Sequence, residues 1–193
     1  EDDVYRPLLD QSPAPLAALM PERTIYISAL SKCIAPGLRM GFVMAPPPLV
    51  QDIAAMQRID CWSTSPLTAL IATRLIEDGH ADQLVAEQRE ELRIRQALLA
   101  THLEGLEFQH SATGTHAWLV LPQPWTGSRF ARLCQDRGVV LLAGGAFTLH
   151  PELSPQAVRI NISAALSREQ LIKALSVISQ LARQGHLYMH NRI

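Results

Sequence analysis

The sequence lacks a charge excess of either sign and any long apolar run. Its 193 residues carry 17 basic and 18 acidic side chains, which give a formal net charge of -1. A nucleic-acid surface spread over the whole chain is therefore excluded, because it needs a clear excess of Lys and Arg. The apolar runs at 139–143 and 160–166 are too short for a bilayer, which takes about 20 residues to cross. Hydrophobic residues nevertheless make up 48% of the chain, enough to exclude a disordered chain.

Cysteine is also scarce, and no pattern of metal ligands is evident. Cys33, Cys61 and Cys134 show no paired spacing, which argues against a disulfide framework and against a zinc site. His186 and His190 are four residues apart but have no third ligand nearby, so we expect no metal. The chain starts with three acidic residues instead of the basic start of a signal peptide. Together with the unpaired thiols, this favours a cytoplasmic protein that contacts no membrane.

Lysine is the rarest charged residue, with only Lys32 and Lys173 among the 17 basic side chains. Lys32 lies in a loop, residues 31–37, that contains a Pro-Gly turn signal and separates two short apolar segments. We expect an amine held near buried strand ends to lose part of its solvation, which would lower its pKa and make it a nucleophile. Arg39 follows on the same loop, and its guanidinium is suited to bidentate phosphate binding.

The hydrophobic pattern predicts an α/β chain in two parts. Before Gly105 it indicates strands at 24–28 and 41–45 and helices at 49–59, 66–77 and 81–103. After Gly105 it indicates strands at 106–109, 115–121, 139–143 and 158–162, and helices at 128–137 and 168–183, the last opened by a capping box at 167–170. This second order, β-β-α-β-β-α, is typical of an α+β domain with helices on one sheet. Two strands are too few for a stable sheet, so those of the first part either pair with the second part or belong to something larger.

Two spaced motifs carry groups that suit one cofactor. Asp2 and Tyr5 have D-x-x-Y spacing, and residues 31–41 read S-K-x-x-x-P-G-x-R-x-G. A carboxylate, a Schiff-base amine and a phosphate-binding guanidinium are the components that hold pyridoxal phosphate. The pair of motifs resembles the signature of fold-type-I, aspartate-aminotransferase-like proteins of the class I/II aminotransferase family. Residues 158–162, VRINI, resemble the segment of that family whose arginine binds the substrate α-carboxylate.

This resemblance implies a role for each residue of the motifs. Pyridoxal 5'-phosphate would be held by Asp2 at the pyridine nitrogen, Tyr5 at the ring hydroxyl, Lys32 through the internal aldimine and Arg39 at the phosphate. Lys32 would also be the catalytic group that moves the α-proton, and Arg159 would bind the substrate carboxylate. The family usually has Ser or Thr three residues before the lysine, where this chain has Ala29, so the resemblance lacks one phosphate ligand.

A second resemblance narrows the branch of the family. Residues 61–67, CWSTSPL, and 116–125, HAWLVLPQPW, resemble MocR-type regulators of the GntR superfamily. In these proteins an aminotransferase-like domain follows an N-terminal winged-helix DNA-binding domain. The implied architecture is the aspartate-aminotransferase-like α/β fold: the C-terminal portion of the large pyridoxal-phosphate domain at 1–80, a connecting helix at 81–104 and the small α+β domain at 105–193. The sequence would then be the C-terminal part of a longer chain that forms homodimers.

Three functions remain open on the sequence. In the first, the chain is the effector-sensing domain of such a regulator: an amino compound or amino acid displaces Lys32 from its aldimine, and DNA is bound only through an N-terminal domain outside this sequence. In the second, the protein is a stand-alone pyridoxal-phosphate-dependent aminotransferase of amino acids and 2-oxo acids. In the third, the chain binds no cofactor because half of the site lies elsewhere. Whether the protein turns over a substrate is left open, and Arg159 implies only an α-carboxylate in the ligand.

Overall fold

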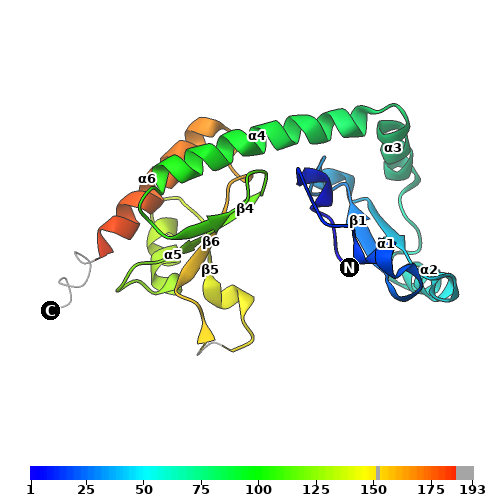
Figure 1. The fold of residues 1–193 in the computed structure, drawn as a ribbon, viewed down its shortest axis with the longest axis horizontal. Helices are drawn as coiled ribbons and strands as arrows, with labels where there is room; N and C mark the ends of the chain where they lie inside the picture. Colours follow the sequence, from blue (N-terminus) through cyan, green and yellow to red (C-terminus); the bar gives the residue numbers. More distant parts are fainter. Residues whose placement is uncertain (151–152, 186–193) are drawn as a thin grey trace. The chain divides into compact units, whose positions relative to one another are not determined.

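The computed structural model describes residues 1–150 and 153–185. The chain forms two compact units, Glu1–Glu90 and Glu91–Ile193, which we call unit 1 and unit 2. The division falls inside the long helix α4 (His80–His102), the green helix in Figure 1. His186 and His190, considered above as metal ligands, lie outside the described residues.

Unit 1 is built on a β-hairpin. Strands β1 (Tyr26–Ala29) and β2 (Gly41–Met44) pair antiparallel, with Tyr26 opposite Met44 and Ala29 opposite Gly41. The two strands of the first part therefore pair with each other and form a sheet of their own. Around them lie the helices α2 (Pro47–Cys61) and α3 (Pro66–Glu77) and the short turns η1 (Arg6–Leu8), α1 (Leu16–Leu19), η2 (Pro21–Arg23) and η3 (Pro36–Leu38).

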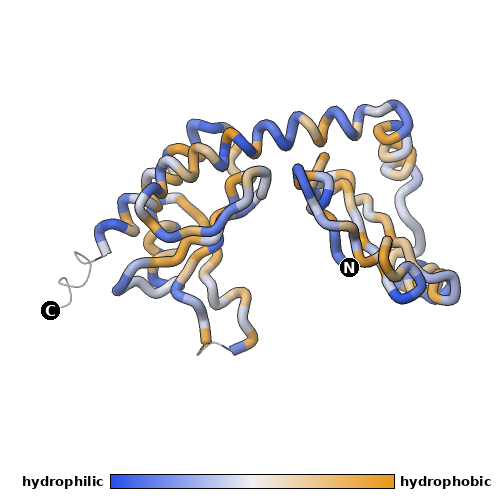
Figure 2. The backbone as a smooth tube through the Cα atoms, viewed as in Figure 1, coloured by the Kyte–Doolittle hydropathy of each residue, from blue (hydrophilic) through white to orange (hydrophobic). Residues whose placement is uncertain are grey.

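The core of unit 1 is small. Leu30, Met40 and Ala72 form its buried cluster, and three partly buried residues pack against them: Ile34, Leu38 and Ala69. Leu30 and Met40 flank the loop that carries Lys32, and the Leu30 N–H donates to the Met40 carbonyl at 3.1 Å, which closes the loop at its base. Helix α2 buries none of its residues, although Figure 2 shows many apolar positions along the hairpin and the helices beside it.

Unit 2 is a four-stranded antiparallel sheet covered by helices. Its strands are β3 (Phe108–His110), β4 (His116–Val120), β5 (Leu142–Ala143) and β6 (Ala157–Asn161), in the spatial order β3-β4-β6-β5. Helices α5 (Gly127–Gln135) and α6 (Arg168–Arg183) complete it. The β-β-α-β-β-α order predicted from the sequence is confirmed, with the short turn η4 (Gly144–Phe147) added after β5.

Alternation along β4 separates the two faces of this sheet. Ala117 and Leu119 are buried in the core, whereas Trp118 between them is only half-buried on the opposite face. Helix α6 presents a stripe of buried residues spaced by three or four positions, which is the pattern of a helix packed on a core: Leu171, Leu175, Ile178, Leu181 and Ala182. Phe130 of α5 is fully buried and meets the Trp125 ring edge-on at 5.3 Å.

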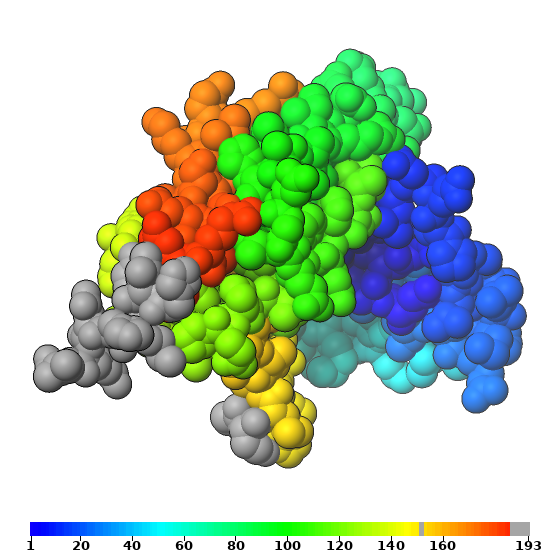
Figure 3. Space-filling view, turned by 60° about the vertical axis from the view of Figure 1, so that its left-hand side comes forward, coloured from blue at the N-terminus to red at the C-terminus, as the bar shows by residue number. Residues whose placement is uncertain are grey.

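The carboxylate of Glu91 joins α4 to α6. Its Oε1 accepts a hydrogen bond from Arg95 Nε at 2.6 Å, and its Oε2 accepts from Arg168 Nη2 at 2.6 Å. Arg95 is buried and also donates to the carbonyls of Ile162 and Ala165, at 2.9 and 2.8 Å. Figure 3 shows this part of α4, in green, beside α6, in orange to red. The hydrogen bonds from Arg168 and Arg95 lower the pKa of Glu91 below its usual value.

We expect Glu91→Gln to destabilise unit 2 in a pH-dependent way. The pKa of Glu91 is lower in the folded than in the unfolded chain, so its contribution is present above the unfolded pKa of about 4.3 and is lost as the pH falls through the folded value. Losing the charged acceptor should cost about 1–2 kcal/mol at neutral pH, and the difference should shrink in acid. Urea unfolding at neutral and at acidic pH measures this free-energy difference. Glu104→Gln, at an exposed position beyond the end of α4, is the control. An equal loss at both pH values would contradict the assignment.

Candidate functional site

Lys32 lies in the turn that follows β1. The turn begins at Leu30, whose carbonyl accepts hydrogen bonds from the N–H groups of Ile34 and Ala35 at 2.9 and 3.1 Å. The Lys32 Nζ lies 6.0 Å from the centroid of the Tyr5 ring. Burial raises the pKa of the neighbouring Cys33 thiol. Cys33 is buried, so the exposed Lys32 amine is the group of this turn that a ligand can reach.

Lys32 is exposed in the described part of the chain. The prediction that its amine loses part of its solvation is therefore wrong there. The reason is local. Lys32 alternates with the buried Cys33 in the turn, and Cys33 takes the inward position, where its Sγ lies 3.4 Å from the Ala29 carbonyl. The turn thus places the thiol in the core of unit 1 and the amine at its surface.

Asp2 is placed beside Lys32's strand by backbone pairing. It forms a parallel bridge with Ile27 of β1, because the Ile27 N–H donates to the Glu1 carbonyl and the Asp3 N–H donates to the Ile27 carbonyl, both at 2.9 Å. The Asp2 carboxylate is exposed, and its Oδ1 accepts from the Val4 N–H at 3.4 Å. The segment that begins with Asp2 therefore runs next to the strand that ends before Lys32.

Asp3, which the sequence analysis did not single out, anchors the segment between Asp2 and Tyr5. Its carboxylate pairs with the Arg6 guanidinium and accepts from the Tyr26 hydroxyl at 3.3 Å. Burial and the adjacent Asp3 charge raise the pKa of Tyr26. An acidic residue three positions before an arginine was the available sequence signal, since that spacing joins the two side chains across one turn.

Arg39 ends the loop in a left-handed conformation, with φ 48° and ψ 32°. This conformation costs a residue other than glycine about 1 kcal/mol, and the adjacent Leu30–Met40 hydrogen bond holds it in place. The guanidinium is exposed. Unit 1 therefore carries an amine, a phenol, a carboxylate and a guanidinium on two neighbouring segments.

Arg159 belongs to unit 2 and lies on β6. It pairs in register with Trp118 of β4 on one side and Leu142 of β5 on the other. Its guanidinium lies over the Phe147 ring, 4.8 Å from the centroid. Within residues 1–150 and 153–185 no carboxylate pairs with Arg159, so its N–H donors are open to an anion. No local pattern in the sequence marks Phe147, because it reaches Arg159 from a turn twelve positions earlier in the chain.

The family model "Aminotransferase class I and II" matches residues 2–178. The chain belongs to this aminotransferase family. The match includes the Lys32 turn and the Arg159 strand, and the chain is an aminotransferase-like domain, as the motifs of the sequence implied.

Relatives of this aminotransferase-like domain include regulators as well as enzymes. The uncharacterized HTH-type transcriptional regulator YdeF of Bacillus subtilis is 31% identical over 94% of this chain and 39% of its own length. The uncharacterized HTH-type transcriptional regulator YdcR of Escherichia coli is 30% identical over 80% of this chain and 32% of its own length. The uncharacterized aminotransferase SSO0104 of Saccharolobus solfataricus is 29% identical over 91% of this chain and 45% of its own length. The chain thus spans less than half the length of these relatives.

Solved aminotransferases share the fold. The aromatic aminotransferase of Pyrococcus horikoshii superposes with a TM-score of 0.85 and 25% identity over 96% of this chain and 51% of its own. An aspartate aminotransferase of Thermus thermophilus superposes with a TM-score of 0.81 and 22% identity, over 93% of this chain and 47% of its own. The α-aminoadipate aminotransferase of the same organism was solved with N-(5'-phosphopyridoxyl)-L-leucine. It superposes with a TM-score of 0.84 and 20% identity, over 97% of this chain and 50% of its own. The aspartate-aminotransferase-like fold predicted from the motifs is confirmed.

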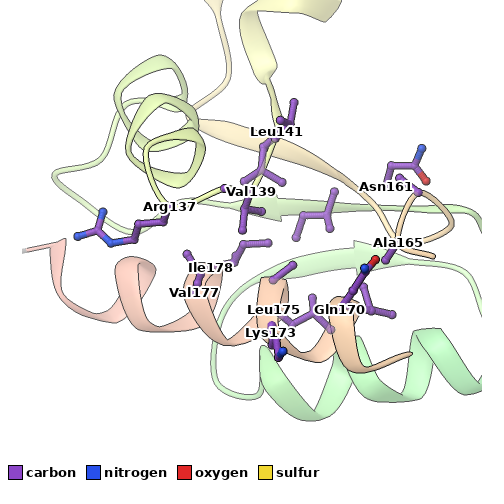
Figure 4. A pocket seen from close by; sticks show the side chains of 16 residues that line it. Arg137, Val139, Leu141, Asn161, Ala165, Gln170, Lys173, Leu175, Val177 and Ile178 are labelled. Atoms are coloured by element: carbon purple, nitrogen blue, oxygen red, sulfur yellow. The ribbon is translucent and has the colours of Figure 1, made fainter. Parts of the chain in front are cut away.

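The groups in unit 1 fit pyridoxal phosphate by their chemistry. The Lys32 amine stands near the Tyr5 phenol, Asp2 starts the segment paired with β1, and Arg39 ends the Lys32 loop. Unit 2 has a separate cavity of about 460 Å³ between α6 and the segment that leads into β5. Figure 4 shows its mainly apolar lining, with Lys173 on α6, and none of the predicted site residues borders it.

Two absences apply to the described part of the chain, residues 1–150 and 153–185. No group of three His, Cys, Asp or Glu side chains there is arranged to hold a metal ion. None of the helices there has the length and apolar character needed to cross a membrane.

Proposed function

We propose that this chain is the pyridoxal-phosphate-binding, effector-sensing domain of a MocR-type regulator of the GntR superfamily. Lys32 holds the cofactor covalently, Asp2 binds its ring nitrogen, Tyr5 its ring hydroxyl and Arg39 its phosphate. Arg159 binds the carboxylate of an amino compound. The observation that carries the proposal is that the segment of Asp2 pairs with β1, the strand that leads into the Lys32 turn, and that the Lys32 Nζ lies 6.0 Å from the centroid of the Tyr5 ring.

Each side chain contributes by its charge. The Asp2 carboxylate favours the protonated ring nitrogen, and pyridoxal phosphate with a protonated ring is an electron sink for carbanion chemistry. The Arg39 guanidinium offers two parallel N–H donors to a phosphate. The Lys32 amine lies 6.0 Å from the centroid of the Tyr5 ring, and in the proposed role it accepts or releases a proton at the ligand's α-carbon.

The regulator role is supported by the relatives. YdeF, an HTH-type transcriptional regulator, aligns over 94% of this chain, and this stretch fills only 39% of that regulator. A DNA-binding segment in the remaining length would let ligand binding at Arg159 and Lys32 alter DNA affinity. An enzyme that acts alone has no such route from its ligand to DNA.

Homodimer formation is part of the proposal and rests on the exposed apolar surface of unit 1. Large apolar side chains of α2, α3 and the turn between them face solvent, with exposed fractions of 63% for Met56, 78% for Ile59, 85% for Trp62 and 67% for Leu67. Soluble proteins rarely expose a contiguous surface of this kind. A partner subunit that covers this surface would remove these apolar side chains from water.

The test uses the protein at its natural length, loaded with pyridoxal phosphate. DNA affinity for the promoter of its own gene is measured with and without a panel of amino acids. A change in DNA affinity that requires both Lys32 and an α-carboxylate supports the proposal. Absence of a winged-helix segment from the natural protein, or DNA affinity that no amino compound alters, contradicts it.

The alternative is a stand-alone aminotransferase, and the enzyme relatives favour it. The aromatic-amino-acid aminotransferase 1 of Thermococcus litoralis is 26% identical over 73% of this chain and 35% of its own length. This alternative predicts sustained turnover between an amino acid and a 2-oxo acid by the natural protein. Turnover without any effect on DNA would favour the enzyme over the regulator.

A further inference from the structure

We propose that Phe147 is a positioning residue for Arg159, and that Trp118 holds Phe147 in place. The proposal rests on the proposed function in one respect, the binding of the ligand carboxylate by Arg159. It adds an aromatic support that sets the direction of the guanidinium before the ligand arrives.

The three side chains meet on one face of the unit 2 sheet. Trp118 and Arg159 are register partners on neighbouring strands, so their side chains stand on the same face. The Phe147 ring comes from η4 and lies under the guanidinium at 4.8 Å, while the Trp118 ring meets Phe147 edge-on, with centroids 5.5 Å apart and planes at 74°. The core of unit 2 is on the other face, where Leu119 and Val158 are fully buried.

The turn that delivers Phe147 is seated tightly. A Cβ at Gly144 would come within 2.5 Å of the Pro155 carbonyl oxygen and 2.9 Å of the Pro155 Cγ. The start of η4 therefore lies directly against the chain that leads into β6, the strand of Arg159. This close approach fixes where the turn begins and limits how far Phe147 can move from the guanidinium.

Core packing does not account for the position of Phe147, because the residue is 48% exposed. Its ring instead contacts the guanidinium and the edge of Trp118. The face of an aromatic ring attracts a guanidinium within about 6 Å of its centroid, and it leaves the N–H groups at the rim of the guanidinium free to donate to a carboxylate. Holding the long side chain in one direction removes part of the entropy cost of binding.

The test compares Phe147→Leu with Phe147→Tyr in the natural protein loaded with pyridoxal phosphate, using sodium acetate as the carboxylate probe. Acetate affinity is measured from the methyl signal of acetate by NMR. The Nε–Hε signal of Arg159, assigned by its loss in Arg159→Gln, reports the ring above or below it. Leu149→Ala is the matched control, since Leu149 lies two residues from Phe147 and is 95% exposed.

We expect Phe147→Leu to weaken acetate binding about three- to tenfold and to move the Arg159 Nε–Hε signal downfield, because the ring current is lost. Phe147→Tyr should keep the acetate affinity and the Arg159 Nε–Hε signal close to those of the unsubstituted protein, and Leu149→Ala should change neither. Trp118→Leu, which leaves the Phe147 ring in place but unsupported, should shift both in the same direction by less. A role of Phe147 in folding alone would leave the acetate affinity and the Arg159 signal of the folded protein unchanged.

Three outcomes overturn the inference, and only the third of them also contradicts the proposed function. If Arg159→Gln abolishes acetate binding while Phe147→Leu leaves it unchanged, Phe147 does not position the guanidinium. If Phe147→Tyr, which keeps the ring, weakens acetate binding as much as Phe147→Leu does, the face of the ring does not position the guanidinium. If Arg159→Gln itself leaves acetate binding unchanged, the proposed carboxylate site is wrong and the inference falls with it.

Discussion

Lys32→Ala is expected to abolish the visible absorbance band of bound pyridoxal phosphate in the natural protein, whereas Lys173→Ala should leave the band unchanged. The chain has only these two lysines. Lys32 has the Tyr5 phenol within reach and shares its loop with Arg39. Lys173 lies on α6 beside a mainly apolar cavity that none of the predicted cofactor-binding residues lines. Covalent binding needs a primary amine, so the effect should be complete for one variant and absent for the other.

The measurement is a titration with pyridoxal phosphate followed by absorbance, and then by borohydride fixation and peptide mapping. The scarcity of lysine makes the mapping decisive, because a modified lysine within this sequence can be only one of two. Retention of the band in Lys32→Ala, or a phosphopyridoxyl group mapped to Lys173, would contradict the assignment of the cofactor site to Lys32. A matched Tyr5→Phe variant should keep the covalent bond and alter only the position of the band.

The largest effect on stability is expected from Phe130→Ala, about 3–5 kcal/mol, as for other fully buried aromatic residues cut to alanine. Phe130 is fully buried, and its ring contacts the buried Trp125 edge-on at 5.3 Å. The substitution removes this contact and leaves a cavity between α5 and the sheet. The exposed Arg132 of the same helix provides the control, because Arg132→Ala should stay within about 0.5 kcal/mol.

Unfolding in urea measures both variants, followed by tryptophan fluorescence. Trp125 is 2% exposed and reports on unit 2, whereas Trp62 of unit 1 is 85% exposed and changes little on unfolding. A cost for Phe130→Ala no larger than that of Arg132→Ala would mean that α5 does not contribute to the core that supports Arg159.

Most elements of the fold followed from the sequence because their signals are local. Helix α3 starts at Pro66 and ends before Gly79, whose φ is +74°, as the proline and glycine indicated. The predicted N-terminal cap of α6 is present, because the Ser167 Oγ accepts a hydrogen bond from the Gln170 N–H at 3.3 Å. The Gln170 Oε1 accepts from the Leu166 N–H and not from the Ser167 N–H that a capping box uses.

Two elements differ from the prediction, and each difference has its own cause. The strand predicted at 139–143 is paired only at Leu142–Ala143, because the Val139 N–H donates to the Cys134 carbonyl at the end of α5. Helix α2 begins at Pro47, two residues earlier than the apolar pattern indicated. Proline lacks the N–H that the first helical position leaves unused, so it opens the helix instead of preceding it.

The residues of the candidate site also divide into those that a local sequence pattern marks and those that it does not. Asp2, Tyr5, Lys32 and Arg39 stand out in the sequence because their spacing is fixed on short segments. The exposure of Lys32 could not be read from the sequence, since the inward position of the turn goes to Cys33. Asp3 is marked only by its spacing to Arg6, three positions on, whereas Phe147 contacts Arg159 across space and neither a period nor a motif marks it.

The hydrogen bond between Leu30 and Met40 has a consequence for engineering this protein. It closes residues 31–39 into one loop, and lengthening such a loop by one residue costs on the order of 0.1 kcal/mol in closure entropy. The same insertion would separate Lys32 from Arg39 by up to about 3.5 Å of additional chain. A library of loop variants screened for thermal stability would therefore retain members whose amine and guanidinium no longer span one ligand, and only a screen for cofactor retention would remove them.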